Sequence, residues 1–347
     1  MIKQAIVKLI AGRDLKVKEA EAVFVEIFEH KASSAQIASF LTALSIKGEK
    51  EDEILAAASV IRAKANKLNL RDDFLGIEDK TQPILDTCGT GGSGLNKFNI
   101  STATSFVVAA FGVKVAKHGN KAMSSNCGSA DVLEALGINI ASKPQIMEEA
   151  IRKVGIGFLY APLYHPALKE VAGIRREMGV RTIFNVLGPL CNPASANFQL
   201  LGVYSRNLVL PLVRVLKKLG AKRAAVINSK DLGDEVSLSG PTYMGLLNNK
   251  KIKSSTLNPS SFSLKKIKLK SLMVKDKQES AKVITGIFNG QKGACRDIVL
   301  ANASVCFYIL GKAANFKQGL RLGADLIDNG QVKDKFLKFK QFIGKNA

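Results

Sequence analysis

The stretch from residue 84 to residue 137 constrains the fold of this chain more than any other part. An apolar run over residues 84–88 follows a proline and precedes a glycine-rich segment, a pattern typical of a buried strand. The apolar run 103–111 predicts a buried helix, and residues 113–116 alternate as a second strand does. A strand, a glycine loop, a helix and another strand in this order predict an α/β architecture.

The glycine loop and the residues after it include several groups that bind phosphate. Residues 89–94, GTGGSG, allow a sharp turn, and the exposed backbone N–H groups of such a loop form an anion cradle. Ser101 or Thr102 is the natural N-cap of the next helix, whose first turn is a second anion site. Lys117 adds a cation where the second strand ends. The stretch therefore predicts a binding site for a ligand with several phosphates.

Two common nucleotide-binding loops do not fit this segment. Gly89, Gly91 and Gly94 have the spacing of a dinucleotide-binding loop, but in that motif the helix opens at the third glycine and an acidic residue follows about 20 residues later. Here the first acidic residue after the loop is Asp131. A Walker A loop requires a lysine where Leu95 stands. A turn without a ligand would explain the glycines, but not the motifs NIST, KHGN and GSAD that follow them.

Composition narrows the possible classes of protein. The 347 residues suit two domains, 46% hydrophobic content supports a real core, and no apolar run approaches a membrane span. Five dispersed cysteines without a CxxC pair favour reduced thiols and a cytoplasmic location. The net charge of +22 favours anionic ligands and raises the hypothesis of nucleic-acid binding. Because the lysines are scattered and tryptophan is absent, nucleic acid is the less favoured partner.

The first 70 residues predict a small helical bundle. Helical patterns cover four segments, and Ser33 and Gln36 form a capping box at the start of the third. No catalytic residue type clusters in this region, so we expect it to have a structural or dimerising role. The polar segment 69–82 links it to the remaining chain, where strands and helices continue to alternate.

Arg175 and the pair Asp234–Glu235 are further candidate ligands. Arg175 falls on the apolar face of a helix predicted within residues 166–179. At such a position an arginine either extends its charged end to solvent or to a salt bridge, or forms the charged end of a pocket for a planar carboxylate. The spacing of Arg175 favours neither interpretation.

The adjacent carboxylates Asp234 and Glu235 lie in a predicted loop. Such a pair is usually solvated, but this pair follows a predicted strand in a basic chain. Two hard oxygen ligands suit magnesium, which shares its coordination shell with substrate phosphates.

The motifs GTGGSG, FNIST, AKHGN, SS and GSADVLEALG have the order and nearly the spacing of those in the anthranilate phosphoribosyltransferases. The chain resembles that family over essentially its whole length, and HPALKEVAGIRREMG followed by RTIFNVLGPLCNPA extends the match. The family shares its fold with pyrimidine nucleoside phosphorylases, whose KHSTGG-like motif is absent here. The resemblance implies a helical lobe over residues 1–70, joined in space by a helical segment near 166–185. It also implies an α/β lobe over residues 71–347 with a central mixed sheet flanked by helices.

The resemblance implies transfer of the phosphoribosyl group from phosphoribosyl pyrophosphate to the amine of anthranilate, which is the second step from chorismate to tryptophan. The residues that would bind phosphoribosyl pyrophosphate are Gly89, Gly92, Ser93, Lys97, Asn99, Ile100, Ser101, Thr102, Lys117, Ser124, Ser125 and Ser129. Those that would bind anthranilate are Gly89, His118, Asn120, Arg175, Gly188 and Pro189, although His118 is equally well explained as a packed structural histidine. Two Mg²⁺ ions per site would be held by Ser101, Asp234 and Glu235. The helical lobe would form a homodimer interface.

No general base is assigned, because an aromatic amine attacks without prior deprotonation. Three residues depart from the family pattern: Ser93 replaces the usual aspartate, Lys97 the usual threonine, and Lys121 a frequent arginine. We expect altered substrate affinity, since Lys97 offers a phosphate contact and Ser93 lacks a carboxylate acceptor. The alternative function is a non-catalytic, nucleic-acid-binding relative of the same fold. The basic charge favours it, but the intact NIST, KHGN and acidic-pair motifs argue against it.

Overall fold

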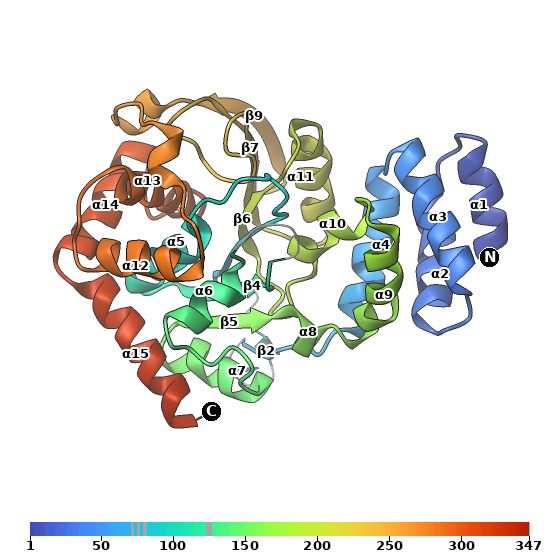
Figure 1. The fold of residues 1–347 in the computed structure, drawn as a ribbon, viewed down its shortest axis with the longest axis horizontal. Coiled ribbons are helices and arrows are strands. Elements are labelled where there is room, and N and C mark those ends of the chain that lie inside the picture. The colour runs from blue at the N-terminus through green and yellow to red at the C-terminus, as the bar shows by residue number, and fades with distance from the viewer. Residues whose placement is uncertain (71–72, 75–76, 79–81, 123–126, 347) are drawn as a thin grey trace.

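The computed structural model of the chain describes residues 1–70, 73–74, 77–78, 82–122 and 127–346. Its N-terminal helices form a bundle at one end of the molecule (Figure 1). They are α1 (Ile2–Ile10), α2 (Val17–Phe28), α3 (Ser34–Lys47) and α4 (Glu51–Lys64). The predicted capping box is present, since the Ser33 N–H donates to Gln36 Oε1 at 2.9 Å and the Gln36 N–H donates to Ser33 Oγ at 3.3 Å. The two reciprocal bonds fix the start of α3.

A mixed sheet forms the centre of the larger lobe, as the resemblance implied. In the described part of the chain it has seven strands in the order β5-β4-β3-β6-β7-β8-β9. Their bounds are β3 (Ile84–Gly89), β4 (Lys114–Gly119), β5 (Ile156–Tyr160), β6 (Phe198–Gly202), β7 (Arg223–Ser229), β8 (Thr242–Asn248) and β9 (Lys251–Leu257). The first five in this order are parallel, and β8 and β9 are antiparallel additions at one edge. The carboxyl ends of the parallel strands therefore meet at one end of the sheet.

Helices cover both faces of this sheet. They are α5 (Ile100–Ala110), α6 (Ser129–Ala135), α7 (Pro144–Lys153), α8 (Ala161–Tyr164), α9 (Lys169–Met178), α10 (Phe184–Leu187), α11 (Val209–Lys218), α12 (Lys277–Phe288), α13 (Ala294–Ile309), α14 (Phe316–Asp328) and α15 (Gln331–Asn346). Successive residues of β7 pack on opposite faces, because side chains alternate along a strand. Ala225 and Ile227 join the core beneath α5 and α13, whereas Val226 joins a core shared with α11 and the bundle.

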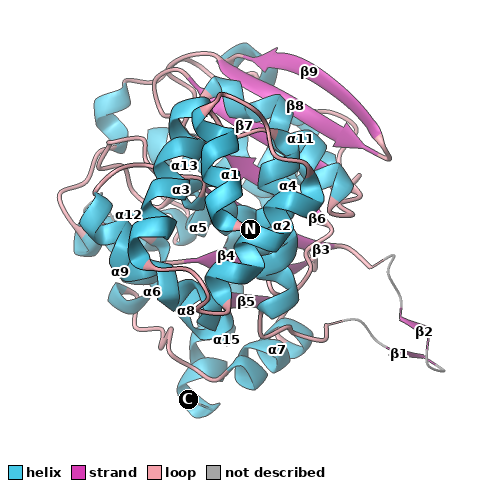
Figure 2. Ribbon diagram, turned by 90° about the vertical axis from the view of Figure 1, so that its right-hand side faces the viewer, coloured by secondary structure: helices cyan, strands magenta, loops and turns pink. Residues whose placement is uncertain are grey.

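Helices α9 and α10 come late in the sequence but lie against the N-terminal bundle (Figure 1), and α9 contacts α3 (Figure 2). Val171 of α9 and Phe184 of α10 are buried in the same apolar cluster as Phe24 and Phe28 of α2. The Phe184 ring meets both phenylalanine rings edge-on at centroid distances of 6.3 and 6.4 Å. This packing brings the chain segment that contains Arg175 to the boundary between the bundle and the sheet.

The start of α5 differs from the sequence expectation. Helix α5 begins at Ile100 with Asn99 as its N-cap residue, so neither Ser101 nor Thr102 caps it. The closing region contains the long helix α13, with α12 before it and α15 after α14. The basic stretch 248–277 includes β9, the last strand in the order of the sheet. Among the helices that the structure describes, none combines the length and apolarity needed to cross a bilayer.

Candidate active site

The glycine loop leaves β3 and runs past the carboxyl end of β6. The Thr90 N–H donates to the Gly202 carbonyl oxygen at 2.9 Å. Gly91, Gly92 and Gly94 have φ angles of 67°, 77° and 71°, which L side chains rarely adopt. The loop conformation thus requires glycine, and it lies where parallel strands present their carboxyl ends to a ligand.

Lys117 places a buried cation beside the first turn of α5. Its side chain, 3% exposed, extends from β4 and donates to the Thr87 carbonyl oxygen at 2.6 Å and to Ser101 Oγ at 3.2 Å. The free N–H groups of a helix N-terminus attract anions, and a lysine at the same point adds a full positive charge. Because Ser101 and Thr102 belong to this first turn, the structure brings together the NIST and KHGN motifs.

Asp234 and Glu235 approach the same strand ends from the loop after β7. A Cβ atom on Gly89 would lie 2.7 Å from Asp234 Oδ2, and one on Gly202 would overlap the Asp234 backbone. Two glycines at the ends of neighbouring strands therefore make room for the acidic loop. Its position is further fixed by the Gly91 N–H, which donates to Asp234 Oδ2 at 2.9 Å.

Glu235 is a buried carboxylate next to a second acid. Burial raises the pKa of its carboxyl to about 7, and the charges of Lys97 and Lys117 only partly oppose that rise. A divalent cation would stabilise the ionised form. Together with Asp234 and the Ser101 hydroxyl, Glu235 offers the hard oxygen ligands that Mg²⁺ prefers. Within the described ranges, no group of three or more His, Cys, Asp and Glu side chains lies close enough together to hold a metal ion by itself.

The start of α6 completes this side of the site. A Cβ on Gly119 would collide with Ser129 Oγ, so the end of β4 and the helix start are in direct contact. Ser129 Oγ also donates to the Asn120 carbonyl oxygen at 3.3 Å. The Asp131 carboxylate accepts the N–H groups of Ala122 and Gly128 at 2.9 and 2.8 Å, which ties the two sides of the intervening loop together. Ser124 and Ser125, expected to bind phosphate, lie outside the described residues.

On the side facing the bundle, His118 is joined to Gly188. His118 Nδ1 lies 3.0 Å from the Gly188 carbonyl oxygen, and since a carbonyl only accepts, Nδ1 bears the proton. Burial lowers the pKa of His118 to about 3, with smaller contributions from His165 and Lys117, so its ring is neutral at pH 7. The Pro189 carbonyl oxygen accepts from Gln199 Nε2 at 2.6 Å. The expected residues His118, Gly188 and Pro189 therefore lie together around the 3₁₀ turn η2 (Gly188–Cys191).

Arg175 approaches this turn from α9. Its guanidinium carbon lies 5.3 Å from the centre of the Phe184 ring, and Phe184 starts the short helix α10 that leads into Gly188. Burial lowers the pKa of the Arg175 guanidinium. Among the residues that the structure describes, no carboxylate forms an ion pair with it. Arg176, its neighbour, is exposed. Arg175 thus presents a partly desolvated cation near the bundle–sheet boundary.

Known proteins similar to this chain share both its parts. Residues 3–65 match the helical bundle domain, and residues 81–333 the a/b domain, of the glycosyl transferase family. The anthranilate phosphoribosyltransferase of Geobacter sp. strain M21 is 47% identical over 335 residues, which cover 95% of each chain. That of Acetivibrio thermocellus is 45% identical and covers 99% of this chain and 96% of its own.

This chain belongs to the anthranilate phosphoribosyltransferase family. It is an enzyme of the glycosyltransferase class, and its fold agrees with solved structures of the family. The enzyme of Thermus thermophilus has a TM-score of 0.89 at 37% identity, covering 98% of this chain and 99% of its own. The enzyme of Saccharomyces cerevisiae, solved in complex with PRPP and Mg, has a TM-score of 0.86 at 26% identity, covering 99% of this chain and 98% of its own.

Several residues of this family member escaped the sequence analysis. Asp86 is fully buried in β3, where Oδ1 accepts the His118 N–H at 3.1 Å and Oδ2 lies 3.4 Å from Gln199 Nε2. An acidic residue inside an apolar strand was the available signal. Arg181 donates to the Gly92 carbonyl oxygen at 3.0 Å and stacks on Tyr204 at 4.7 Å. It steadies the glycine loop from the bundle side, and only its proximity to Arg175 in sequence could have indicated it.

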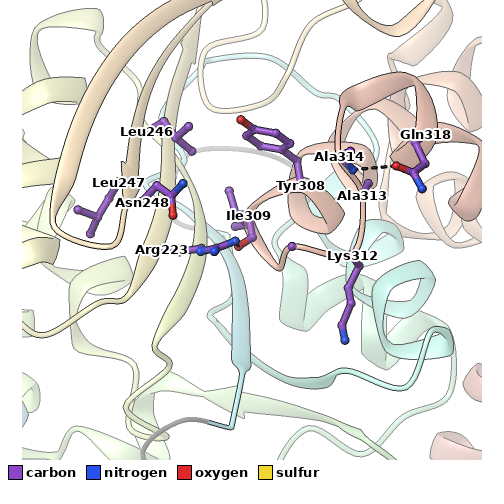
Figure 3. A pocket seen from close by; sticks show the side chains of 11 residues that line it. Arg223, Leu246, Leu247, Asn248, Tyr308, Ile309, Lys312, Ala313, Ala314 and Gln318 are labelled. Carbon is purple, nitrogen blue, oxygen red and sulfur yellow. Dashed lines mark hydrogen bonds between the residues drawn. The ribbon is translucent and has the colours of Figure 1, made fainter.

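A cavity lies apart from these residues, and Figure 3 shows the side chains that line it. It has a volume of about 420 Å³ and lies between the start of β7, the end of β8 and the turn after α13, where Arg223, Leu246 and Tyr308 line it. Arg223 begins β7, whereas the acidic pair follows the other end of that strand. None of the expected substrate residues lines this cavity. A much smaller cavity of about 10 Å³ is lined in part by Thr102 and Lys117, two of the expected substrate residues.

Proposed function

We propose that this enzyme transfers the phosphoribosyl group from phosphoribosyl pyrophosphate to the amine of anthranilate, with Mg²⁺, in tryptophan biosynthesis. The supporting observation is the meeting of Lys117, the first turn of α5, the glycine loop and the Asp234–Glu235 loop at one end of the sheet. A sugar that carries both a phosphate and a pyrophosphate requires such cations, backbone N–H groups and metal ligands to bind it. The yeast relatives solved with PRPP and Mg and with 4-fluoroanthranilate support the same substrates.

In this proposal the protein binds and positions the two substrates and forms no covalent bond with either of them. The amine attacks the anomeric carbon while the bond to pyrophosphate breaks, and the nitrogen then loses its proton to solvent. Negative charge grows on the leaving group, so fixed donors aimed at it lower the barrier. Lys117, held by Thr87 and Ser101, is such a donor, and the backbone N–H groups of α5 and of the glycine loop add others. The proposed contacts to phosphoribosyl pyrophosphate also include Ser93, Lys97, Asn99 and Ser129.

Two Mg²⁺ ions would be held by Ser101, Asp234 and Glu235, and would supply charge neutralisation for the pyrophosphate. The Glu235 carboxylate fits this role because burial disfavours its ionised form, and a bound cation would stabilise that form. We assign the acceptor to the opposite side. Arg175 would grip the anthranilate carboxylate, since a guanidinium matches a carboxylate in two parallel hydrogen bonds. Gly188 and Pro189, with Asn120 and Gly89, would enclose its ring.

His118 has a structural role in this proposal. Its neutral ring and its hydrogen bond to Gly188 fix the acceptor side of the site, and its low pKa makes it a poor base. An aromatic amine needs no base before it attacks, so a mechanism without a titrating histidine is consistent. His118 thereby positions the wall that anthranilate would contact.

We further propose a cytoplasmic homodimer formed through the bundle, with residues 1–70 and the segment near 166–185 acting as one lobe. Exposed apolar side chains on the neighbouring helices α1 and α3 support a dimer interface on the bundle. They are Val7, Ile10 and Ile46, which are 66%, 74% and 83% exposed. Exposed large apolar side chains on one element are typical of an interaction surface. The five free thiols agree with a reducing compartment.

The test is the decay of anthranilate fluorescence with phosphoribosyl pyrophosphate and Mg²⁺, omitting each component in turn. We expect decay only in the complete mixture. Lys117→Met should lower kcat/KM for phosphoribosyl pyrophosphate at least about 100-fold, because it removes a donor to the developing charge. Lys114→Met, at the other end of the same strand, is the matched control and should keep its rate. Salt-sensitive DNA binding by a folded protein without any decay would contradict the proposal.

A further inference from the structure

The cavity in Figure 3 has the size and the mixed lining of a site for a small ligand, and we name it the Arg223 cavity. Its volume of about 420 Å³ lies within the range of about 300–1,000 Å³ that is typical of small-molecule sites. Leucine, isoleucine and alanine side chains form much of the lining, and Arg223, Lys312 and Tyr308 add polar groups. No Asp or Glu lines the cavity, so its two charged residues are both cations.

The Arg223 guanidinium is the strongest ligand-binding group of this cavity. The side chain reaches from the start of β7 to the end of α13, where Nη1 donates to the Ile309 carbonyl oxygen at 3.4 Å. In the described part of the chain this long bond is the one hydrogen bond of the guanidinium, and no carboxylate forms an ion pair with it. A guanidinium has five N–H donors in a planar fork that matches a carboxylate. Most of the donors of Arg223 are therefore available to an anionic ligand.

The turn after α13 leaves room beside the guanidinium. Gly311 has a φ angle of 69°, which L side chains rarely adopt, and a Cβ there would lie 3.0 Å from Arg223 Nη1. The backbone closes the turn by itself, since the Gly311 N–H donates to the Tyr308 carbonyl oxygen at 3.0 Å and the Lys312 N–H to the Phe307 carbonyl oxygen at 2.9 Å. This wall of the cavity is thus formed before any ligand binds.

An apolar surface borders the guanidinium. Leu246 of β8 and the Tyr308 ring lie on the same side of Arg223 in Figure 3, and both residues are half-buried. The Tyr308 ring is supported by Phe316, whose ring centroid lies 4.9 Å away. A carboxylate bound to Arg223 would place an attached group against Leu246 and a braced aromatic ring. An aromatic group gains most from such contacts, because two rings attract each other beyond the area that they bury.

We propose that the Arg223 cavity is a second ligand site, which binds a small aromatic carboxylate through Arg223 and against the Tyr308 ring. The site is separate from the one proposed for anthranilate, because Arg223 begins β7 and the acidic pair follows the other end of that strand. Inorganic phosphate would pair with the guanidinium but leave the apolar walls uncovered. A neutral aromatic molecule would leave the guanidinium without an anion. A ligand with both a ring and a carboxylate uses both parts of the lining.

The experiment titrates 3-phenylpropionate against the full chain by saturation-transfer NMR. We expect saturable binding with a Kd of about 5 mM or lower, which is the affinity that ordinary ligand efficiency gives a molecule of this size. Equal concentrations of inorganic phosphate or of neutral 3-phenylpropanol should not displace the probe. Displacement by phosphate would reduce the cavity to a simple anion site, and displacement by the alcohol would reduce it to an apolar one. Either result, or the absence of saturable binding, would overturn the proposal.

Variants locate the bound probe. Arg223→Leu should weaken binding at least about tenfold, and Arg223→Lys should retain part of the affinity, because an ammonium keeps the charge without the planar fork. Arg13→Leu removes an exposed arginine of the bundle and should bind as the wild type does. Arg175→Ala should also bind normally. Loss of binding in Arg175→Ala, with normal binding in Arg223→Leu, would place the probe in the acceptor site and contradict the proposal.

A second pair of variants keeps Arg223, because Arg223→Leu also removes a hydrogen bond from the end of α13. Leu246→Glu places a carboxylate in the cavity that competes for the guanidinium, whereas Leu246→Gln has the same size without the charge. Thermal unfolding of each variant shows whether it folds. We expect Leu246→Glu to bind 3-phenylpropionate at least about tenfold more weakly than Leu246→Gln. Equal affinities of these two folded variants would mean that Arg223 only stabilises the helix end.

Discussion

The Gly91 N–H donates a hydrogen bond of 2.9 Å to Asp234 Oδ2, across 143 positions of sequence. This bond joins the glycine loop after β3 directly to the acidic loop after β7. The phosphate-binding and metal-binding halves of the proposed site therefore form one unit. The glycines at the ends of β3 and β6 permit this contact, because a larger residue would occupy the space of Asp234.

Gly202→Ala tests this close approach. Its added methyl would overlap the Asp234 backbone and displace the acidic loop. We expect a loss of about 1–3 kcal/mol in the free energy of unfolding, together with at least tenfold weaker Mg²⁺ activation. Gly344→Ala in α15 is the control, since a Cβ there meets no atom within 4 Å. Denaturant unfolding measures the free energy of unfolding of both variants. Equal values for the two would show that the acidic loop tolerates the added methyl group.

Arg175→Ala tests the acceptor site. The loss of a two-point carboxylate contact should raise the KM for anthranilate about 10- to 100-fold while leaving kcat and the KM for phosphoribosyl pyrophosphate little changed. Arg175→Lys should recover only part of the affinity, because an ammonium cannot reproduce the planar fork. Arg176→Ala, at the exposed neighbouring position, is the matched control. An equal rise of the KM for anthranilate in Arg175→Ala and Arg176→Ala would contradict the assignment of Arg175 to the anthranilate carboxylate.

Ser93→Asp tests one of the departures from the family pattern. Ser93 Cβ lies 2.9 Å from the position that a Cβ on Gly233 would occupy, so it borders the acidic loop directly. A carboxylate there restores an acceptor for a ribose hydroxyl or a metal-bound water. We expect a KM for phosphoribosyl pyrophosphate that is about three- to tenfold lower, the range of one hydrogen bond. Ser93→Asn controls for size, and an unchanged KM in Ser93→Asp would refute the prediction.

Asp86 predicts a pH dependence of stability. Burial raises the pKa of its carboxyl from 3.8 to about 6 in the folded protein. Between these values the folded state retains a proton that the unfolded state has released, so the free energy of unfolding falls as the pH rises through this window. The loss attributable to Asp86 amounts to about 3 kcal/mol. Asp86→Asn should lack this pH-dependent part of the free energy of unfolding. The measurement is the free energy of unfolding of both proteins, from denaturant titrations between pH 4 and pH 7. The same pH dependence in both proteins would contradict the prediction.

Ile46→Asp tests the proposed dimer. A carboxylate on the exposed outer side of α3 should separate the protomers if this surface is the interface, because burying an unpaired charge is costly. Light scattering should then report the mass of a single chain. Leu337→Asp introduces the same charge at a half-exposed position of α15, remote from the bundle, and should leave the mass unchanged. An unaltered dimer in Ile46→Asp would place the interface elsewhere.

The sequence predicted the elements whose signals are local. Apolar runs, glycines and caps located the strands around the glycine loop and the bundle helices, and the motif order predicted the family. It could not predict that α5 would begin directly after Asn99, whose side chain makes no capping bond to the helix and instead accepts a hydrogen bond from Ser280 Oγ at 2.8 Å, across 181 positions. Asp86 and the ion pair between Lys97 and Asp234 were missed for the same reason. Long-range partners decide the roles of these residues, and no single segment of sequence includes both members of such a pair.

The most direct measurement identifies the product. The full chain would be incubated with anthranilate, phosphoribosyl pyrophosphate and Mg²⁺, with mass spectrometry of the products and a parallel count of released pyrophosphate. Our account predicts one phosphoribosyl adduct on the anthranilate nitrogen for each pyrophosphate released, and neither product with Lys117→Met. A folded wild-type protein that releases pyrophosphate without forming the adduct, or that leaves both substrates unchanged, would contradict it.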